Sequence, residues 1–256
     1  MADMQRIHHQ YVAHTAHITL AHAPVNVIDI SMMDELLAAI QEAEVKPEIT
    51  AILFCGEGKC FSAGVDIAAH APATIQEMLS KFHTIINAIA NSQKVTIASV
   101  HGNCLGGGAE LAMVCDIVYT ELDATWSFPE IKLACYPPVA CAVLAALVGQ
   151  KRAAELILSG ESISGSDAML IGLATACGDP QDMEKITTRL LERLGKLSPS
   201  ALRLAKKASY AWNAVHFDKA LARAEKIYLE ELMQTADMEE GINAWREKRQ
   251  PKWSGK

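Results

Sequence analysis

The chain has 256 residues, of which 50% are hydrophobic and 21% are charged, a composition that predicts one large globular domain or a domain with an appendage. Acidic residues outnumber basic ones by 30 to 23, and the formal net charge is −7. A protein that binds nucleic acid without sequence preference needs a basic surface, so we expect no nucleic-acid partner.

No segment is expected to cross or anchor to a membrane. The longest apolar run without charges, Tyr136–Gly149, is shorter than the roughly 20 residues that a bilayer requires. The N-terminus MADMQRIHHQ lacks the apolar core of a secretory signal. The seven cysteines are odd in number and include no C-x-x-C pair, which favours buried free thiols in a reducing compartment. We therefore expect a cytoplasmic protein.

The first part of the chain predicts alternating strands and helices. The apolar and β-branched patterns predict strands over residues 11–20, 51–55, 95–100 and 117–120. Helices are expected over 32–44, with Ser31 as the N-cap, and over about 74–91. Strand, glycine-containing loop and helix recur in this order, which indicates an α/β architecture.

From about residue 198 the pattern changes. Glycine becomes rare, charge rises, and amphipathic helices are predicted over about 199–213, 217–234 and 237–248. We therefore divide the chain into a core of residues 1–197, which carries the candidate site, and a helical region of residues 198–256. That region is expected to pack on its own core or on a neighbouring subunit.

The most informative segment is Cys104-Leu-Gly-Gly-Gly-Ala-Glu110. Consecutive glycines let a backbone approach a ligand, and the start of the following helix offers unpaired N–H groups and a positive dipole end. The spacing matches neither phosphate-binding glycine motif, so an oxyanion is the favoured ligand. A turn that only permits close helix–strand packing is the alternative.

Two carboxylates lie in apolar surroundings. Glu110 belongs to the first turn of an apolar helix, and Glu130 follows Pro129 in the segment FPEIKL. Paired carboxylates in a dry pocket can have their pKa values pushed apart and so divide acid from base work. Each residue alone has an ordinary explanation, dipole compensation for Glu110 and solvation for Glu130.

The loop Phe61-Ser-Ala-Gly-Val-Asp66 follows a buried strand and is a second candidate. Its small residues allow the Val65 N–H to approach the glycine triplet, so that two backbone donors meet one oxygen. Asp66 is expected to cap the next turn. The segment has no G-x-S-x-G elbow, so Ser62 is not expected to be a nucleophile.

The remaining reactive side chains carry no recognisable site. Histidines 8, 9, 14, 17 and 22 lack metal-ligand spacing and are expected at the surface, so no metal is predicted. Cys104 has no nearby base and is expected to pack in the core.

Taken together, these segments resemble the crotonase superfamily, the enoyl-CoA hydratases and isomerases. The resemblance covers nearly the whole chain and rests on the order and spacing of five segments, GEGKC with FSAGVDI, HGNCLGGGAELAMVCDIVY, FPEIKL, LSGESISGSDAMLIGLA and EEGINAWREKR. It implies an α/β fold, a spiral of repeated ββα turns with a C-terminal helical region that builds homotrimers, commonly paired into hexamers. It also implies an acyl-CoA thioester substrate, with coenzyme A as part of the substrate and no separate cofactor.

The resemblance also implies roles for individual residues. Val65 and Gly107 match the residues whose N–H groups hold the thioester oxygen, and Glu110 and Glu130 match the two glutamates that position and activate water. Ala63, Asp66 and Ile67 match the turn that binds the adenine of coenzyme A. Trp245 and Lys248 match an aromatic residue and a lysine that a neighbouring subunit contributes to coenzyme A binding.

Because both glutamates are present, the resemblance favours a hydratase over an isomerase or a thioesterase. This family is usually glycine-rich after the second glutamate, whereas here the segment is Ala134-Cys-Tyr-Pro-Pro-Val-Ala-Cys141. In addition, the loop after Asp66 carries His70 and Pro72. With Asn26–Asp29 and Tyr228–Met233, these features are similar to the cyclohexa-1,5-diene-1-carbonyl-CoA hydratases of anaerobic benzoyl-CoA breakdown. We therefore expect water addition to a cyclic dienoyl-CoA. A straight-chain enoyl-CoA hydratase, an isomerase and a non-catalytic acyl-CoA-binding protein are the alternatives.

Overall fold

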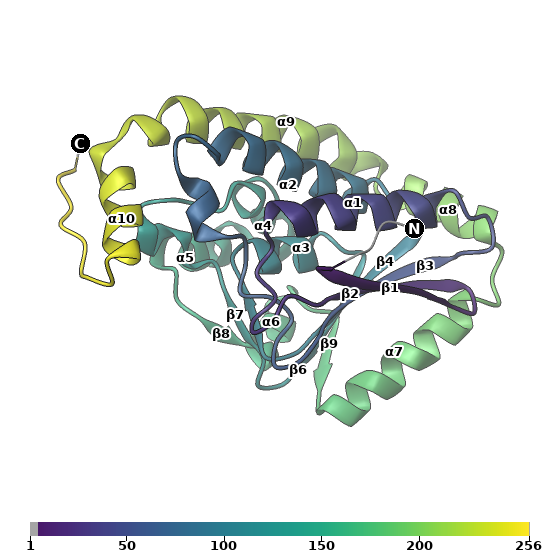
Figure 1. The fold of residues 1–256 in the computed structure, drawn as a ribbon. Coiled ribbons are helices and arrows are strands. Elements are labelled where there is room, and N and C mark those ends of the chain that lie inside the picture. Colours follow the sequence, from purple (N-terminus) through teal and green to yellow (C-terminus); the bar gives the residue numbers. More distant parts are fainter. Residues whose placement is uncertain (1–4, 256) are drawn as a thin grey trace.

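The computed structural model describes residues 5–255, and the side chains of all of these except 211–215. Its larger sheet has six strands in the order β1-β2-β3-β4-β6-β9. Every neighbouring pair is parallel except β1 and β2, which are antiparallel. Figure 1 shows the sheet under a layer of helices. The strands are Ile7–Val12, Thr15–Leu20, Ala51–Gly56, Val95–Val100, Ile117–Glu121 and Ala176–Gly178.

One row of side chains explains why the central strands pair in this register. Ile18 pairs with Phe54, Phe54 with Ala98, and Ala98 with Val118, and all four are buried. This face packs in the main core with apolar side chains of helices α1 (Ile30–Glu44) and α2 (Ile75–Ala90). Burial of a continuous apolar row stabilises the sheet and fixes its register, because a shift by one residue would turn the row away from α1 and α2 to the opposite face.

The opposite face of the sheet is covered by later helices. Leu53 and Ile97 pack with leucines of α7 (Pro180–Leu194) and with Leu202 of α8 (Pro199–Ser209). Figure 1 shows α1 and α2 above the sheet and α7 below it. Strands with helices on both faces give the layered α/β architecture that the sequence predicted.

A smaller sheet, in the order β5-β7-β8, positions the candidate site. Strands β5 (Asn103–Leu105) and β7 (Thr125–Ser127) are parallel, and β8 (Ile163–Ser164) completes the sheet. Leu105 pairs with Ser127, and the Gly106 N–H donates to the Ser127 carbonyl at 2.9 Å. Because parallel strands end at the same edge, the segments that follow β5 and β7 emerge side by side. These segments are helix α3 (Gly107–Met113) and the 3-10 helix η2 (Pro129–Leu133).

Two local predictions near the N-terminus are wrong. The single strand expected over 11–20 is a hairpin of β1 and β2 that turns at Ala13, whose φ is +50°. Its turn contains no glycine, proline or asparagine, so the usual sequence signal was missing. Helix α1 is capped by Asp29, which accepts from the Met32 N–H at 2.8 Å, and not by Ser31.

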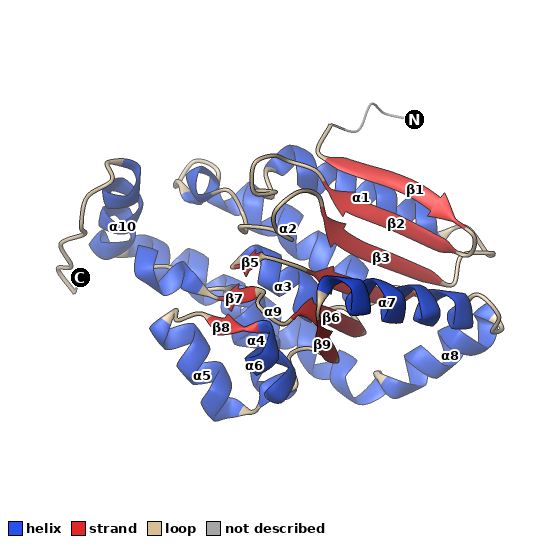
Figure 2. Ribbon diagram, turned by 90° about the horizontal axis from the view of Figure 1, so that it is seen from below, coloured by secondary structure: helices blue, strands red, loops and turns tan. Residues whose placement is uncertain are grey.

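The C-terminal helices lie along the rest of the molecule. Besides α8 they are α9 (Ala211–Glu230), the 3-10 helix η3 (Leu232–Gln234) and α10 (Ala236–Arg246). Helix α9 packs against α4 (Pro138–Val148), and α10 lies at the far end of the molecule (Figure 2). The domain boundary at residue 198 and the role of this region in assembly stay predictions.

The remaining helices are η1 (Ile67–His70), α5 (Gln150–Ser159) and α6 (Gly165–Leu170). Within residues 5–255, none of the helices combines the length and the apolar character that a membrane span requires.

Candidate active site

Two unpaired backbone N–H groups lie next to one another at the start of α3. The residues on either side of Val65 are bonded to a neighbouring segment, since the Ile28 N–H donates to the Gly64 carbonyl and the Asp66 N–H donates to the Ile28 carbonyl. The Val65 N–H is left without a hydrogen-bond partner among the described residues, as is that of Gly107, the first residue of α3. Two such donors suit an oxygen atom that develops negative charge.

The glycines permit this close approach. A Cβ atom on Gly107 would lie 2.5 Å from Cγ2 of Val65 and 3.3 Å from its backbone nitrogen. Gly106 has a φ of +50°, and a Cβ there would lie 2.5 Å from Oε1 of Glu130. Any larger residue would displace either the Val65 loop or the Glu130 carboxylate, so both positions require glycine.

Glu110 lies on α3 and is 3% exposed. Its Oε1 accepts a hydrogen bond from the Ala140 N–H at 2.9 Å, in the first turn of α4. Burial raises the pKa of the carboxyl group, and the N–H groups of Ala140 and Val139 oppose that rise. The start of α4 therefore favours the ionised form of Glu110.

Glu130 comes from η2 and has different surroundings. Its Oε2 atom is buried and has no hydrogen-bond partner among the described residues. Burial raises the pKa of this carboxyl group, and the nearby charge of Glu110 raises it further. Two carboxyl groups in one dry site resist double ionisation, so the pair holds a proton at pH values where an exposed glutamate has lost its own.

Both glutamates and both unpaired N–H groups line one cavity. It encloses about 620 Å³ of space free of atoms, counted with its opening to solvent. Ala63 and Ile67, which the resemblance assigned to the adenine-binding turn, line it too. Most of the rest of the wall is apolar or aromatic, formed by residues Met78, Leu79, Phe82, Pro129, Leu133, Cys135, Tyr136, Pro137, Pro138 and Tyr228.

Two polar residues of this wall entered the sequence analysis only as features of the resemblance, without a role of their own. His70 ends η1, and its Nδ1 lies 3.1 Å from the Asp66 carbonyl. Burial lowers the pKa of His70, which favours the neutral ring. Tyr228 reaches the cavity from α9. Because Tyr228 is far from the other wall residues in sequence, its place in the cavity becomes visible only in the fold.

The other residues expected to bind coenzyme A lie outside the cavity lining. Asp66 caps η1 by accepting from the Ala68 N–H at 3.0 Å, which confirms its expected capping. Trp245 is 46% exposed on α10, and Lys248 follows that helix with a φ of +54°. Their contribution from a neighbouring subunit, like the adenine contacts of Ala63, Asp66 and Ile67, stays a prediction.

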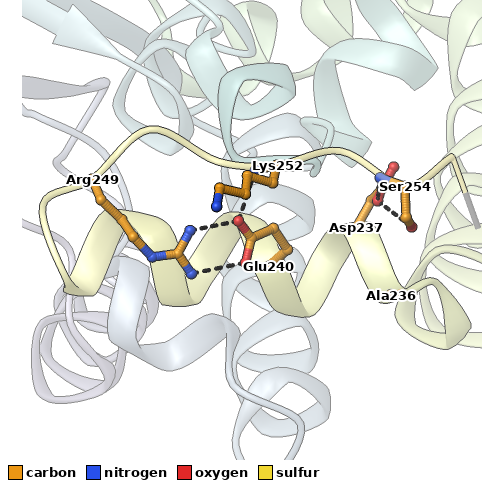
Figure 3. Close-up of a pocket in the computed structure, with 6 residues that line it drawn as sticks. All are labelled: Ala236, Asp237, Glu240, Arg249, Lys252 and Ser254. Carbon is orange, nitrogen blue, oxygen red and sulfur yellow. Dashed lines mark hydrogen bonds and ion pairs between the residues drawn. The ribbon is translucent and has the colours of Figure 1, made fainter.

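A second hollow lies between α10 and the C-terminal segment (Figure 3). There Arg249 forms a bidentate ion pair with Glu240 at 2.6 and 2.8 Å, and the backbone N–H of Lys252 donates to the same carboxylate. Arg249 lowers the pKa of Glu240 to about 2. Glu240 is thus used to hold the C-terminal segment against α10.

Other reactive side chains are accounted for by local bonding. The Ser62 hydroxyl donates to the Asn26 carbonyl and accepts from the Gly64 N–H, so it shapes the Val65 loop. Cys104 is fully buried, as expected, whereas Cys141 is exposed, contrary to the expectation of buried thiols, because it lies on an outward position of α4. The part of the chain that the structure describes contains no cluster of three or more His, Cys, Asp and Glu side chains that could hold a metal.

Comparison with known proteins places this site in context. Residues 11–256 match the family model described as enoyl-CoA hydratase/isomerase. A cyclohexa-1,5-dienecarbonyl-CoA hydratase of Thauera aromatica is 32% identical over 93% of this chain and 92% of its own. A probable enoyl-CoA hydratase of Bacillus subtilis is 31% identical over 93% of this chain and 94% of its own.

Solved structures agree. An enoyl-CoA hydratase/isomerase of Xanthobacter autotrophicus Py2 superposes with a TM-score of 0.88 at 28% identity, over 95% of this chain and 93% of the other. The DspI protein of Pseudomonas aeruginosa superposes with a TM-score of 0.80 at 30% identity, over 99% and 98% of the two chains. The expected crotonase fold is confirmed, and the chain is an enzyme that belongs to the enoyl-CoA hydratase/isomerase family, whose substrates are acyl-CoA thioesters.

Proposed function

We propose that the enzyme adds water to a cyclic conjugated dienoyl-CoA, converting cyclohexa-1,5-diene-1-carbonyl-CoA to 6-hydroxycyclohex-1-ene-1-carbonyl-CoA. The observation that carries the hydration is the pair Glu110 and Glu130, which face one buried cavity beside two unpaired N–H groups. Hydration needs one group to accept a proton from water and another to deliver a proton to carbon. A protein that only bound the thioester would have no use for two buried carboxyl groups.

The surroundings of the two glutamates support a division of roles. Glu110 accepts from an N–H at the start of α4, which stabilises its charge, so it is the base that takes the proton of water. Glu130 lacks a donor on Oε2 and faces the charge of Glu110, so it keeps a proton and is the acid. Water bonds through its oxygen to the ring carbon β to the carbonyl, and the electron pair of the broken double bond moves toward the thioester.

The resulting dienolate is stabilised at its oxygen by the N–H groups of Val65 and Gly107. Each such donor typically contributes about 3–4 kcal/mol to the transition state in a site that excludes water. The start of α3 adds a favourable dipole at the same place. Glu130 then protonates the far end of the dienolate, which leaves one double bond and one hydroxyl group on the ring, and the overall change is the addition of one water molecule.

The cavity wall supports a ring as the acyl group. The wall contains Pro137 and Pro138, which restrict the backbone, and the stacked rings of Tyr136 and Tyr228. Together they form a rigid, largely apolar surface. A rigid wall suits a rigid substrate, since neither has to lose much conformational freedom on binding. The similarity to the Thauera aromatica hydratase supports the same substrate, at 32% identity.

The test is a mass-resolved assay of the purified enzyme with the cyclic diene thioester and, separately, with crotonyl-CoA. A gain of one water from the diene supports the proposal. Hydration of crotonyl-CoA alone would assign the enzyme to straight-chain substrates, and a change of double-bond position without a change of mass would make it an isomerase. Binding without any change of either thioester would leave only an acyl-CoA-binding role.

We propose further that the enzyme is a homotrimer or a dimer of trimers, in which Trp245 and Lys248 of one subunit contact coenzyme A bound to the next. Helices α5 and α6 expose large apolar side chains that suit subunit contacts, with Leu158 70% and Leu170 81% exposed. Light scattering of the purified protein, recorded as it elutes from a size-exclusion column, measures the mass of the assembly. A monomer would contradict this part of the proposal.

A further inference from the structure

Tyr228 carries a hydroxyl group that the fold buries in the candidate site without a partner. Its side chain is 1% exposed and lines the same cavity as Glu110 and Glu130. The hydroxyl oxygen has no hydrogen-bond partner within the described residues. A buried polar group without a partner is costly, and native proteins keep few of them. The position therefore calls for an explanation beyond packing, which phenylalanine would serve as well.

The neighbouring tyrosine shows the difference. Tyr136 stacks against Tyr228 edge to face at 5.1 Å between ring centroids, and its hydroxyl donates to the Ala224 carbonyl at 2.7 Å. The Tyr136 hydroxyl is thus bonded to a backbone carbonyl, whereas the Tyr228 hydroxyl has no such bond.

The Cys135 sulfur lies beside the Tyr228 hydroxyl and interacts with it, but sulfur is a weak hydrogen-bond acceptor. Its own contacts run from Sγ to the Leu133 carbonyl at 3.4 Å and to the Met238 sulfur at 3.3 Å. An oxygen atom of a ligand in the cavity would be a stronger acceptor for the Tyr228 proton than this sulfur.

Helix α9 is anchored one turn before Tyr228. The Tyr136 hydroxyl bonds to Ala224, and His83 of α2 pairs with the Glu225 carboxylate. Ala224 and Glu225 precede Tyr228 by four and three residues, so all three lie on the same face of the helix. These anchors connect α9 to α2 and to the segment before α4, and they hold the phenol in place over the cavity.

The unpartnered atoms of Tyr228 and Glu130 are complementary to a hydroxyl-bearing ligand. Oε2 of Glu130 is the other buried polar atom of this cavity without a partner among the described residues. A water molecule or an alcohol oxygen can accept from the phenol and at the same time share a hydrogen bond with the carboxyl group. Neither group finds such a partner in the apolar wall.

We infer that Tyr228 is a substrate-contacting residue whose hydroxyl donates a hydrogen bond to the oxygen atom that hydration adds to the acyl group. The inference rests on the proposed hydration. Burial and the neighbouring Cys135 and Glu130 groups raise the pKa of Tyr228, so the phenol stays protonated and acts as a donor at neutral pH. The tyrosine orients water for attack and, in the reverse direction, holds the hydroxyl group that leaves.

The first experiment compares Tyr228→Phe with Tyr11→Phe, a control at the surface of β1 whose hydroxyl bonds to Glu42. Tyr228→Phe is expected to lower kcat for hydration about 10- to 100-fold and to keep or raise Tm, because it removes a buried unpartnered hydroxyl. Tyr11→Phe is expected to leave kcat unchanged. A kcat within twofold of the wild type, or a fall in Tm that accompanies the loss of kcat, would overturn the inference.

A binding experiment separates this inference from the proposed function. Calorimetry measures the Kd of two matched thioesters, 6-hydroxycyclohex-1-ene-1-carbonyl-CoA and cyclohex-1-ene-1-carbonyl-CoA, which differ by one hydroxyl group. Tyr228→Phe is expected to weaken the hydroxylated ligand about tenfold and to leave the other unchanged. Equal effects on both ligands would overturn the role of Tyr228, whereas a wild type that binds both but hydrates nothing would contradict the proposed function alone.

Discussion

Oε1 of Glu110 accepts a hydrogen bond from the N–H of Ala140 at 2.9 Å, so a residue of helix α3 is bound to the first turn of α4. Glu130, across the same cavity, has no comparable donor at its Oε2 atom. These surroundings favour the ionised form of Glu110 and the protonated form of Glu130. This asymmetry is the basis of the acid and base roles proposed above and of the first three predictions.

Replacing either glutamate by glutamine is expected to reduce hydration strongly. Glu110→Gln removes the proposed base and Glu130→Gln the proposed acid, and each should lower kcat by about 10²- to 10⁴-fold. Binding of a saturated acyl-CoA should change little, because the amide keeps the shape of the side chain. Steady-state kinetics and calorimetry measure the two effects. Turnover close to that of the wild type in both variants would rule out the mechanism.

The pH dependence of kcat/KM is expected to be bell-shaped around neutral pH. The active form has one proton on the pair, because burial and mutual repulsion raise both pKa values above those of exposed glutamates. Activity should fall at low pH as the pair gains its second proton and at high pH as it loses both. A pH–rate profile checks this, and a profile flat from pH 5 to 9 would contradict a shared proton.

The same raised pKa values predict how stability depends on pH. A carboxyl group whose pKa is higher in the folded state binds more protons there, so its contribution to stability is full below the unfolded value of about 4.5. That contribution is lost as pH rises through the raised pKa. Glu130→Gln should therefore stabilise the protein at pH 8 by about 1–3 kcal/mol and hardly at pH 4.5. Urea unfolding at both pH values measures the difference, and equal effects would contradict it.

Gly106→Ala is expected to reduce activity by moving the Glu130 carboxylate. The new Cβ would lie 2.5 Å from Oε1 of Glu130, so the side chain has to shift. Gly58→Ala is a matched control, because Gly58 also has a positive φ, +76° against +50°, but has no atom within 4 Å of the Cβ position. Both variants should lose about 1–2 kcal/mol of stability, and only Gly106→Ala should lose more than tenfold in kcat. Equal activity in the two would contradict the steric argument.

Gly107→Ala tests the proposed oxyanion hole. Its Cβ would lie 2.5 Å from Cγ2 of Val65 and 3.2 Å from the ring of Phe82, so the two N–H groups would be pushed apart. Loss of one donor should lower kcat by about 10²- to 10³-fold. The affinity for free coenzyme A, which has no thioester oxygen, should stay the same. A variant that keeps full turnover would show that the two N–H groups do not act on the substrate.

The central strands could be predicted from the sequence because their signal is local. Residues 51–55 and 95–100 are short apolar runs bounded by polar or turn residues, and a strand buried on both faces requires such a run. The N-terminal hairpin could not be predicted in the same way. Its turn at Ala13 has no characteristic residue, and pairing of β1 with β2 defines it.

The sequence by itself determined the family, the two glutamates and the glycine turn, because motifs in a fixed order retain their identity whatever the three-dimensional arrangement. Only the tertiary structure decided how these parts meet. Pairing of β5 with β7 brings Glu110 and Glu130 to one cavity, and the packing of α9 buries Tyr228 beside them. The apolar face of a predicted helix indicates that this face is buried, but it does not identify the residues against which the face packs. Contacts between residues distant in the chain depend on the whole core, and that is why the third polar group of the site became visible only in the fold.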